Sequence, residues 1–176
     1  FELTGLTPGS VVHYRVIEGG RPGPDRTFRV PPAPGESFRF AHMGDTQFYE
    51  MANRDAHQLF TTLIRDFEPN LVVSTGDMVA SERGGSGPDG WRYPEVGRWN
   101  IFFDVAAPML AESFFMAAMG NHEEDAPYFW DIFAFPEPDA PAIDHYDFRF
   151  GSVHFIVLYT GSTGGWDADG ILDSQT

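Results

Sequence analysis

The chain has 176 residues, of which 42% are hydrophobic and 15% aromatic, so it has enough apolar material to bury a core. Its 26 acidic and 11 basic residues give a net charge of −15, which disfavours binding to the phosphate backbone of nucleic acids. The absence of cysteine excludes disulfide scaffolds, thiolate metal sites and cysteine nucleophiles, and no apolar run is long enough to span a membrane.

The first predicted elements are two strands joined by a turn. Residues 11–17 alternate between two faces, a segment rich in glycine and proline follows, and residues 26–30 form the partner strand. Because a two-stranded hairpin is marginal by itself, we interpret these strands as the last two of a β-sandwich. Leu6 and Pro8-Gly9 precede Tyr14 in the sequence context of a tyrosine corner.

A proline-rich linker at residues 31–36 predicts a domain boundary between residues 1–30 and residues 37–176. The second region reads as strand, helix, strand, helix, strand, a pattern that favours a mainly parallel sheet with helices packed against it. A later pair of alternating segments predicts a hairpin, either at the edge of this sheet or in a second sheet. The predicted strands are residues 38–43, 71–75, 114–119, 145–150 and 153–159.

The first predicted helix has apolar residues at helical spacing and is expected to bury them. His42, inside the first strand, is expected to be buried and hydrogen-bonded, whereas His57 on the helix is expected to face solvent. The residues expected to face inward are Ala52, Ala56, Leu59, Phe60, Leu63, Ile64 and Phe67.

Three of the predicted strands end in a glycine followed by a polar residue: Gly44-Asp45, Gly76-Asp77 and Gly120-Asn121. One such pair alone is typical of an ordinary turn, but three at successive strand ends form a more specific pattern. Ligands of open α/β sheets bind beyond the carboxyl ends of the strands, so these polar side chains are expected to meet. Carboxylates, an amide oxygen and a nearby histidine suit zinc, manganese, iron or magnesium. Two such ions about 3.5–4 Å apart can clamp a phosphoryl group and activate a bridging water.

These motifs resemble the first three signature blocks of the calcineurin-like metallophosphoesterases, and within them the purple acid phosphatases. The matching segments are Gly44-Asp45-Thr46-Gln47, then Gly76-Asp77, then Gly120-Asn121-His122-Glu123. Upstream, Gly5-Leu6-Thr7-Pro8-Gly9 and Tyr14-Arg15-Val16 resemble the end of the fibronectin-III-like domain that precedes the catalytic domain in the purple enzymes. The resemblance implies part of an α/β/β/α sandwich, preceded by the last strands of a fibronectin-III-like β-sandwich.

The resemblance also implies a role for each matching residue. Asp45 would bind the first metal, Asp77 would bridge both metals, and Asn121 would bind the second. His122 would lie over the phosphoryl group, to stabilise the transition state or to protonate the leaving oxygen, which suits a side chain that exchanges protons near neutral pH. Glu123 would lie behind these residues and orient His122. The implied cofactor is a pair of metal ions, iron together with zinc, manganese or a second iron.

The sequence departs from the family pattern at two of these positions. Where the family's first block has histidine, or glycine in the purple enzymes, this chain has Gln47, whose amide oxygen could coordinate the first metal or point elsewhere. Where the purple enzymes carry the tyrosine that binds iron, this chain has Ala80, so their colour is not expected.

The family's later metal-binding histidines have no match after Glu123. His145 and His154 lie within the alternating hairpin, and His154 is expected to be an ordinary strand residue. We therefore expect that the sequence is a fragment of a longer protein and that the fragment alone has little or no activity.

The expected function is hydrolysis of phosphate monoesters at a two-metal site, with metal-bound hydroxide as the nucleophile. A phosphodiesterase on the same scaffold is one alternative, because loops form the substrate pocket, and an inactive surface-binding module is another. The expected partner is a phosphorylated small molecule or protein, without nucleic acid. By family resemblance the protein is expected to be secreted, periplasmic or on the cell surface; the sequence leaves its oligomeric state open.

Overall fold

The computed structural model describes residues 3–47, 54–79, 95–123, 127–135 and 145–158. Its central element is a three-stranded parallel sheet in the order β5-β6-β7, which confirms the predicted βαβαβ arrangement. The elements of this region are β5 (Phe40–Met43), α1 (Arg54–Asp66), β6 (Leu71–Ser74), α2 (Glu95–Leu110), β7 (Phe114–Ala117), α3 (Pro127–Ile132), β8 (His145–Phe150) and β9 (Val153–Leu158).

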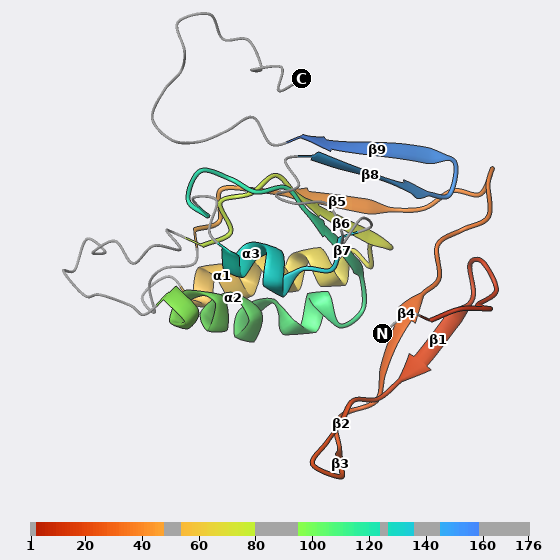
Figure 1. Ribbon diagram of the computed structural model, residues 1–176. Helices are drawn as coiled ribbons and strands as arrows, with labels where there is room; N and C mark the ends of the chain where they lie inside the picture. The colour runs from red at the N-terminus through yellow and green to blue at the C-terminus, as the bar shows by residue number, and fades with distance from the viewer. Residues whose placement is uncertain (1–2, 48–53, 80–94, 124–126, 136–144, 159–176) are drawn as a thin grey trace, which may run out of the picture.

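The sheet lies between a layer of helices and a second, antiparallel sheet formed by β8 and β9 (Figure 1). β6 is the central strand, and its residues are buried, apart from the partly buried Val73, because layers cover both faces. On the hairpin side, Phe150 packs against Phe38 and Phe114, with ring centroids 4.9 and 5.7 Å apart. The Tyr146 hydroxyl donates to the carbonyl of Ala117 at 2.8 Å. The hairpin therefore belongs to a second sheet, as in the predicted partial α/β/β/α sandwich.

Helix α1 presents a different face to the core from the one predicted. Leu59 and Leu63 are 61% and 60% exposed, and Phe67 just beyond the helix is 48% exposed. The buried residues of the helix are Thr61 and Ile64. The Thr61 hydroxyl lies within hydrogen-bonding distance of carbonyl oxygens of α1 and, at 3.1 Å, of that of Val105 in α2, so a polar residue can occupy the contact between the two helices.

The two histidines of this region also differ from their predicted positions. His42 is exposed rather than buried, because β5 is the edge strand of the described sheet and His42 lies on the same face as the half-exposed Phe40. His57 is half-buried rather than solvent-facing. Its position follows from the rotation of α1, which turns the helix face that contains His57, Thr61 and Ile64 inward.

The N-terminal strands form the predicted antiparallel hairpin, in which β1 (Val11–Tyr14) pairs with β4 (Arg26–Arg29). β2 (Ile17–Glu18) and β3 (Arg21–Pro22) extend it toward the turn. The assignment of residues 1–30 to the end of a fibronectin-III-like domain, with a linker at residues 31–36, stays a prediction.

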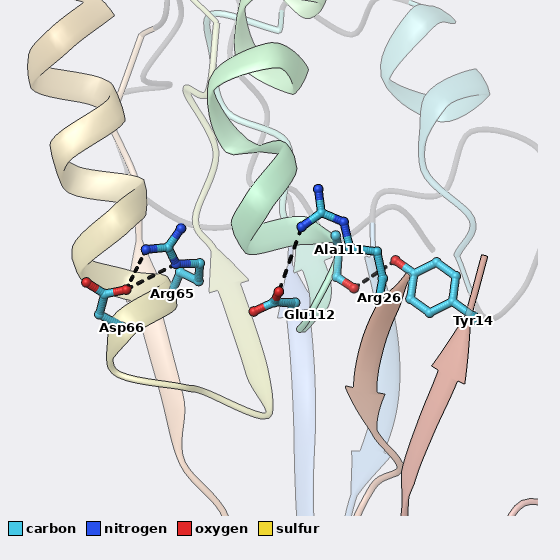
Figure 2. Close-up of polar contacts among 6 residues, drawn as sticks. All are labelled: Tyr14, Arg26, Arg65, Asp66, Ala111 and Glu112. Carbon is cyan, nitrogen blue, oxygen red and sulfur yellow. Dashed lines mark hydrogen bonds and ion pairs between the residues drawn. The ribbon is translucent and has the colours of Figure 1, made fainter. Parts of the chain in front are cut away.

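The hairpin docks on the segment that joins α2 to β7, as Figure 2 shows. The Tyr14 hydroxyl donates to the carbonyl of Ala111 at 2.7 Å, and the Phe28 ring meets that of Phe114 edge-on at 5.7 Å. Arg26 lies 3.9 Å from the carboxylate of Glu112. The tyrosine-corner prediction is therefore wrong: a corner tyrosine bonds to nearby backbone within its own sandwich, whereas Tyr14 bonds across to the α/β region.

Replacement of Tyr14 by phenylalanine removes this hydroxyl and leaves the ring in place. We expect Tyr14→Phe to lower the free energy of unfolding by about 1 kcal/mol, the usual net contribution of one such hydrogen bond. Chemical denaturation of the complete protein measures the change. The control is Arg26→Gln, which breaks a long, partly exposed ion pair and is expected to cost less than about 0.5 kcal/mol. Equal unfolding curves for Tyr14→Phe and the wild type would contradict the described interface.

None of the helices in the described part of the chain is long and apolar enough to cross a membrane.

Candidate metal centre

The three Gly-polar pairs lie together at the carboxyl end of the parallel sheet. Backbone hydrogen bonds join the segments that follow β5 and β6: Asp45 N–H donates to the carbonyl of Gly76 at 3.1 Å, and Gln47 N–H to that of Asp77 at 2.8 Å. From the β7 side, the backbone N–H of His122 donates to Oδ1 of Asp77 at 2.8 Å. The sequence predicted that the strand ends bring these residues together, and the backbone segments that carry them do lie side by side.

Glycine is required at two of these strand ends because the chains approach so closely. A Cβ atom on Gly76 would lie 2.6 Å from Cα of Gly120 and would also collide with its nitrogen. A Cβ on Gly120 would collide with the backbone nitrogen and carboxylate of Asp77. Gly76 also has φ of +99°, which L side chains rarely adopt. The sequence signal of strand-end glycines therefore has a steric cause.

Three of the polar residues at this edge have left-handed backbone conformations. Asp45, Gln47 and Asp77 have φ values of +53°, +43° and +54°. Aspartate tolerates this region better than most residues, but glutamine has no such advantage. Strain of this kind persists only where the surrounding structure enforces it, and it concentrates at functional sites.

Asp77 is the most enclosed of the proposed ligands. It is 8% exposed, while Asp45 and Asn121 are exposed and Gln47 is half-buried. One carboxylate oxygen of Asp77 accepts the amide of His122, which fixes the orientation of the carboxylate group. Because it follows the central strand of the three, Asp77 lies between the ends of β5 and β7, where a bridging ligand would have to be.

Glu123 lies behind the proposed ligands and contacts the backbone of two strand-end segments. Its carboxylate accepts backbone hydrogen bonds from both strand-end segments, and it is fully buried. Burial raises the pKa of the Glu123 carboxyl, while the amide donors act in the opposite direction. The four donors are the amides of Asp77, Met78, Val79 and Gly120.

His57 is a neighbour of this edge that sequence reasoning missed. Burial lowers its pKa, and a hydrogen bond with the backbone of Thr46 opposes the shift. Thr46 lies between Asp45 and Gln47, so α1 supports the first of the three segments. The sequence signal was weak, because His57 adjoins Ala56, which was expected to face inward.

The donor chemistry at this edge fits hard or borderline cations. Asp45 and Asp77 supply carboxylates, and Asn121 and Gln47 supply amide oxygens, which suit iron, manganese, zinc or magnesium. No group of three histidine, aspartate or glutamate side chains able to hold a metal occurs within the part of the chain that the structure describes.

The two later histidines lie in the hairpin of β8 and β9. His154 is in β9, as predicted, and its Nε2 lies 2.6 Å from the Asp147 carboxylate. His145 begins β8. Ala80, the position of the missing tyrosine, falls outside the described residues.

Comparisons with known proteins agree with this architecture. A family model described as calcineurin-like phosphoesterase matches residues 38–173. The fold is similar to a purple acid phosphatase, PPD1, from seeds of yellow lupin (Lupinus luteus), with a TM-score of 0.63 and 17% sequence identity over 88% of this chain and 31% of that one. It is also similar to PhoD, with a TM-score of 0.64 and 17% identity over 89% of this chain and 38% of that one. The chain thus spans about a third of the length of these two structures, and no curated protein matches its sequence significantly.

Proposed function

Because the chain belongs to the calcineurin-like phosphoesterase family, we propose that the complete protein hydrolyses phosphate monoesters at a two-metal centre. The observation that carries the proposal is the position of Asp77. Its carboxylate lies at the end of the central strand, is almost fully enclosed, and is already oriented by the His122 amide.

The residues of this chain would share the coordination among the three strand ends. Asp45 would bind the first metal, with the amide oxygen of Gln47 as a further donor, and Asn121 would bind the second. Asp77 would contribute to both. Support comes from the backbone hydrogen bonds that join the segments of Asp45 and Asp77, and from the left-handed conformations of both aspartates.

When bound, such a metal pair neutralises the charge of a phosphate ester and lowers the pKa of a coordinated water. The positive charge also matters for a chain of net charge −15, which would otherwise repel an anionic substrate. Iron with zinc, manganese or a second iron is the proposed pair.

His122 would act on the substrate rather than on the metals. Its backbone is fixed through the amide that bonds to Asp77, so its imidazole would be held over the edge of the sheet where the ligands gather. There it would protonate the leaving oxygen or stabilise charge on the phosphoryl group.

The first experiment measures metal content and hydrolysis in the complete protein. We expect about two bound metal ions per chain, and faster cleavage of p-nitrophenyl phosphate than of bis(p-nitrophenyl) phosphate. The reverse preference would support the phosphodiesterase alternative. A protein that holds no metal and cleaves neither ester would instead support an inactive surface-binding module.

A second experiment tests the role of His122. We expect His122→Ala to lower kcat by a factor of about 10²–10⁴, the usual contribution of general acid–base catalysis, with metal content unchanged. The metals are retained because the amide that orients Asp77 is a backbone group. The control is His154→Ala in β9, which is expected to leave kcat at the wild-type value. A His122→Ala protein as active as the wild type would rule out the proposed acid.

The expected substrate is a phosphorylated small molecule or protein. We also propose that the protein is secreted, periplasmic or on the cell surface. Fractionation of cells that express the complete protein tests this location.

A further inference from the structure

We propose that Glu123 is a positioning residue that sets the spacing between the ends of β6 and β7, and thereby the spacing of the ligands that those ends would supply. The inference rests on the proposed function. Its basis is a carboxylate that is fully buried, with both oxygens accepting hydrogen bonds from backbone amides.

One oxygen of Glu123 joins the two strand ends directly. Oε2 accepts the N–H of Asp77 at 2.9 Å and the N–H of Gly120 at 2.8 Å. Since both bonds have ordinary lengths and share one acceptor, the two backbones cannot separate without breaking at least one of them. Asp77 and the residue after Gly120, Asn121, are the proposed ligands on either side of this joint.

The other oxygen fixes the segment that follows Asp77. Oε1 accepts the N–H of Met78 at 2.8 Å and that of Val79 at 3.3 Å. Together with the amide of Asp77, three successive N–H groups are directed at one carboxylate, an arrangement that resembles the anion-binding concavities formed by backbone amides. This set of bonds holds Asp77 in its left-handed conformation.

Each of the two strand-end segments also supplies a carboxylate that binds the backbone of the other. Glu123, from the β7 side, binds the backbone of Asp77, and Asp77, from the β6 side, binds the backbone of His122. Movement of either segment would therefore displace both the proposed bridging ligand and the proposed acid. This reciprocal arrangement links the geometry of the metal centre to the position of His122.

Only a side chain with acceptors at both terminal positions can satisfy all four amide donors. A glutamine at position 123 would retain one oxygen but place an NH2 group against two N–H donors, which leaves those donors unsatisfied in a buried site. An aspartate would keep both acceptors but is one methylene shorter. Glu123→Gln therefore tests the chemistry of the carboxylate, and Glu123→Asp tests its reach.

Hydrogen exchange in the complete protein measures how strongly these amides are protected, without relying on catalytic turnover. In the wild type, we expect the amides of residues 77–79 and 120 to be protected although they lie outside the strands. In Glu123→Gln, we expect their exchange to accelerate by about tenfold or more, because burial of the unsatisfied donors favours opening. Titration with Mn²⁺ should show weaker binding of at least one ion by a similar factor.

The matched control is Glu68→Gln, the same substitution at an exposed glutamate that pairs with Arg39. It should leave both exchange at residues 77–79 and Mn²⁺ binding at wild-type values. If Glu123→Gln does not fold, Glu123→Asp and the wild-type protection pattern carry the test.

The outcomes separate this inference from the proposed function. Wild-type exchange at residues 77–79 as fast as in an exposed loop would overturn the inference. So would unchanged exchange and Mn²⁺ binding in Glu123→Gln. A wild-type protein that binds no metal would refute the proposed function instead, and the exchange data alone would then decide whether Glu123 fixes the two strand ends.

Discussion

Asp77→Asn is expected to remove most of the metal and to lower kcat/KM by about a thousandfold or more, while the protein stays folded. The fold should survive because asparagine tolerates the left-handed conformation, with φ of +54°, as well as aspartate does. Its side-chain oxygen can still accept the amide of His122. The charge, however, is lost at the one position that would contact both metals, and the transition state would lose that electrostatic stabilisation.

Metal analysis by mass spectrometry, hydrolysis of p-nitrophenyl phosphate and a thermal melt together test this prediction. The matched control is Asp66→Asn at the end of α1, which precedes the start of β6 rather than its carboxyl end and where the carboxylate pairs with Arg65. That variant should keep its metals and its rate. An Asp77→Asn protein that retains both metals and full activity would show that Asp77 is not the bridge.

Gly76→Ala is expected to be the most destabilising single methyl addition at the candidate site, at about 3 kcal/mol or more. Two effects combine: the φ of +99° is unfavourable for alanine, and the new methyl group would overlap backbone atoms of Gly120, which cannot move without separating β6 from β7. Both strand ends would then shift, so metal binding should also weaken.

Gly35→Ala separates the two effects. Gly35 has φ of +92°, close to that of Gly76, but a Cβ there would meet no atom within 4 Å. Alanine at position 35 should therefore lower the free energy of unfolding only through the strained backbone conformation, by about 1 kcal/mol. Denaturant unfolding of the two variants gives the steric contribution by difference, and equal costs would contradict the close approach of Gly76 and Gly120.

The local sequence was sufficient to predict most of the strands. Each has a short run of apolar or alternating residues followed by a glycine or a turn, and such signals depend only on neighbours along the chain. The antiparallel pairing of residues 11–14 with 26–29, and the parallel sheet of β5, β6 and β7, were both predicted correctly. The short helix α3 was not predicted, because its six residues are too few to show a helical period.

The face of α1 that is buried depends on the neighbouring helix α2. The sequence pattern of α1 alone therefore predicted the wrong face. Leu59, Leu63 and Phe67 have helical spacing, but contact with α2 selects the side that contains Thr61 and Ile64. A hydrophobic period identifies a helix, whereas the position of the neighbouring elements decides its rotation.

Asp45, Asp77 and Asn121 could be singled out from the sequence because each follows a strand-end glycine, and parallel strands bring such ends to one edge. The roles of Tyr14 and Glu123 could not be obtained in this way. Tyr14 bonds to a carbonyl 97 residues away, and Glu123 to amides 44 to 46 residues away. The sequence by itself determined which residues gather at the edge of the sheet. Only the tertiary structure decided how they are held there, because hydrogen bonds between distant segments leave no periodic trace in the chain.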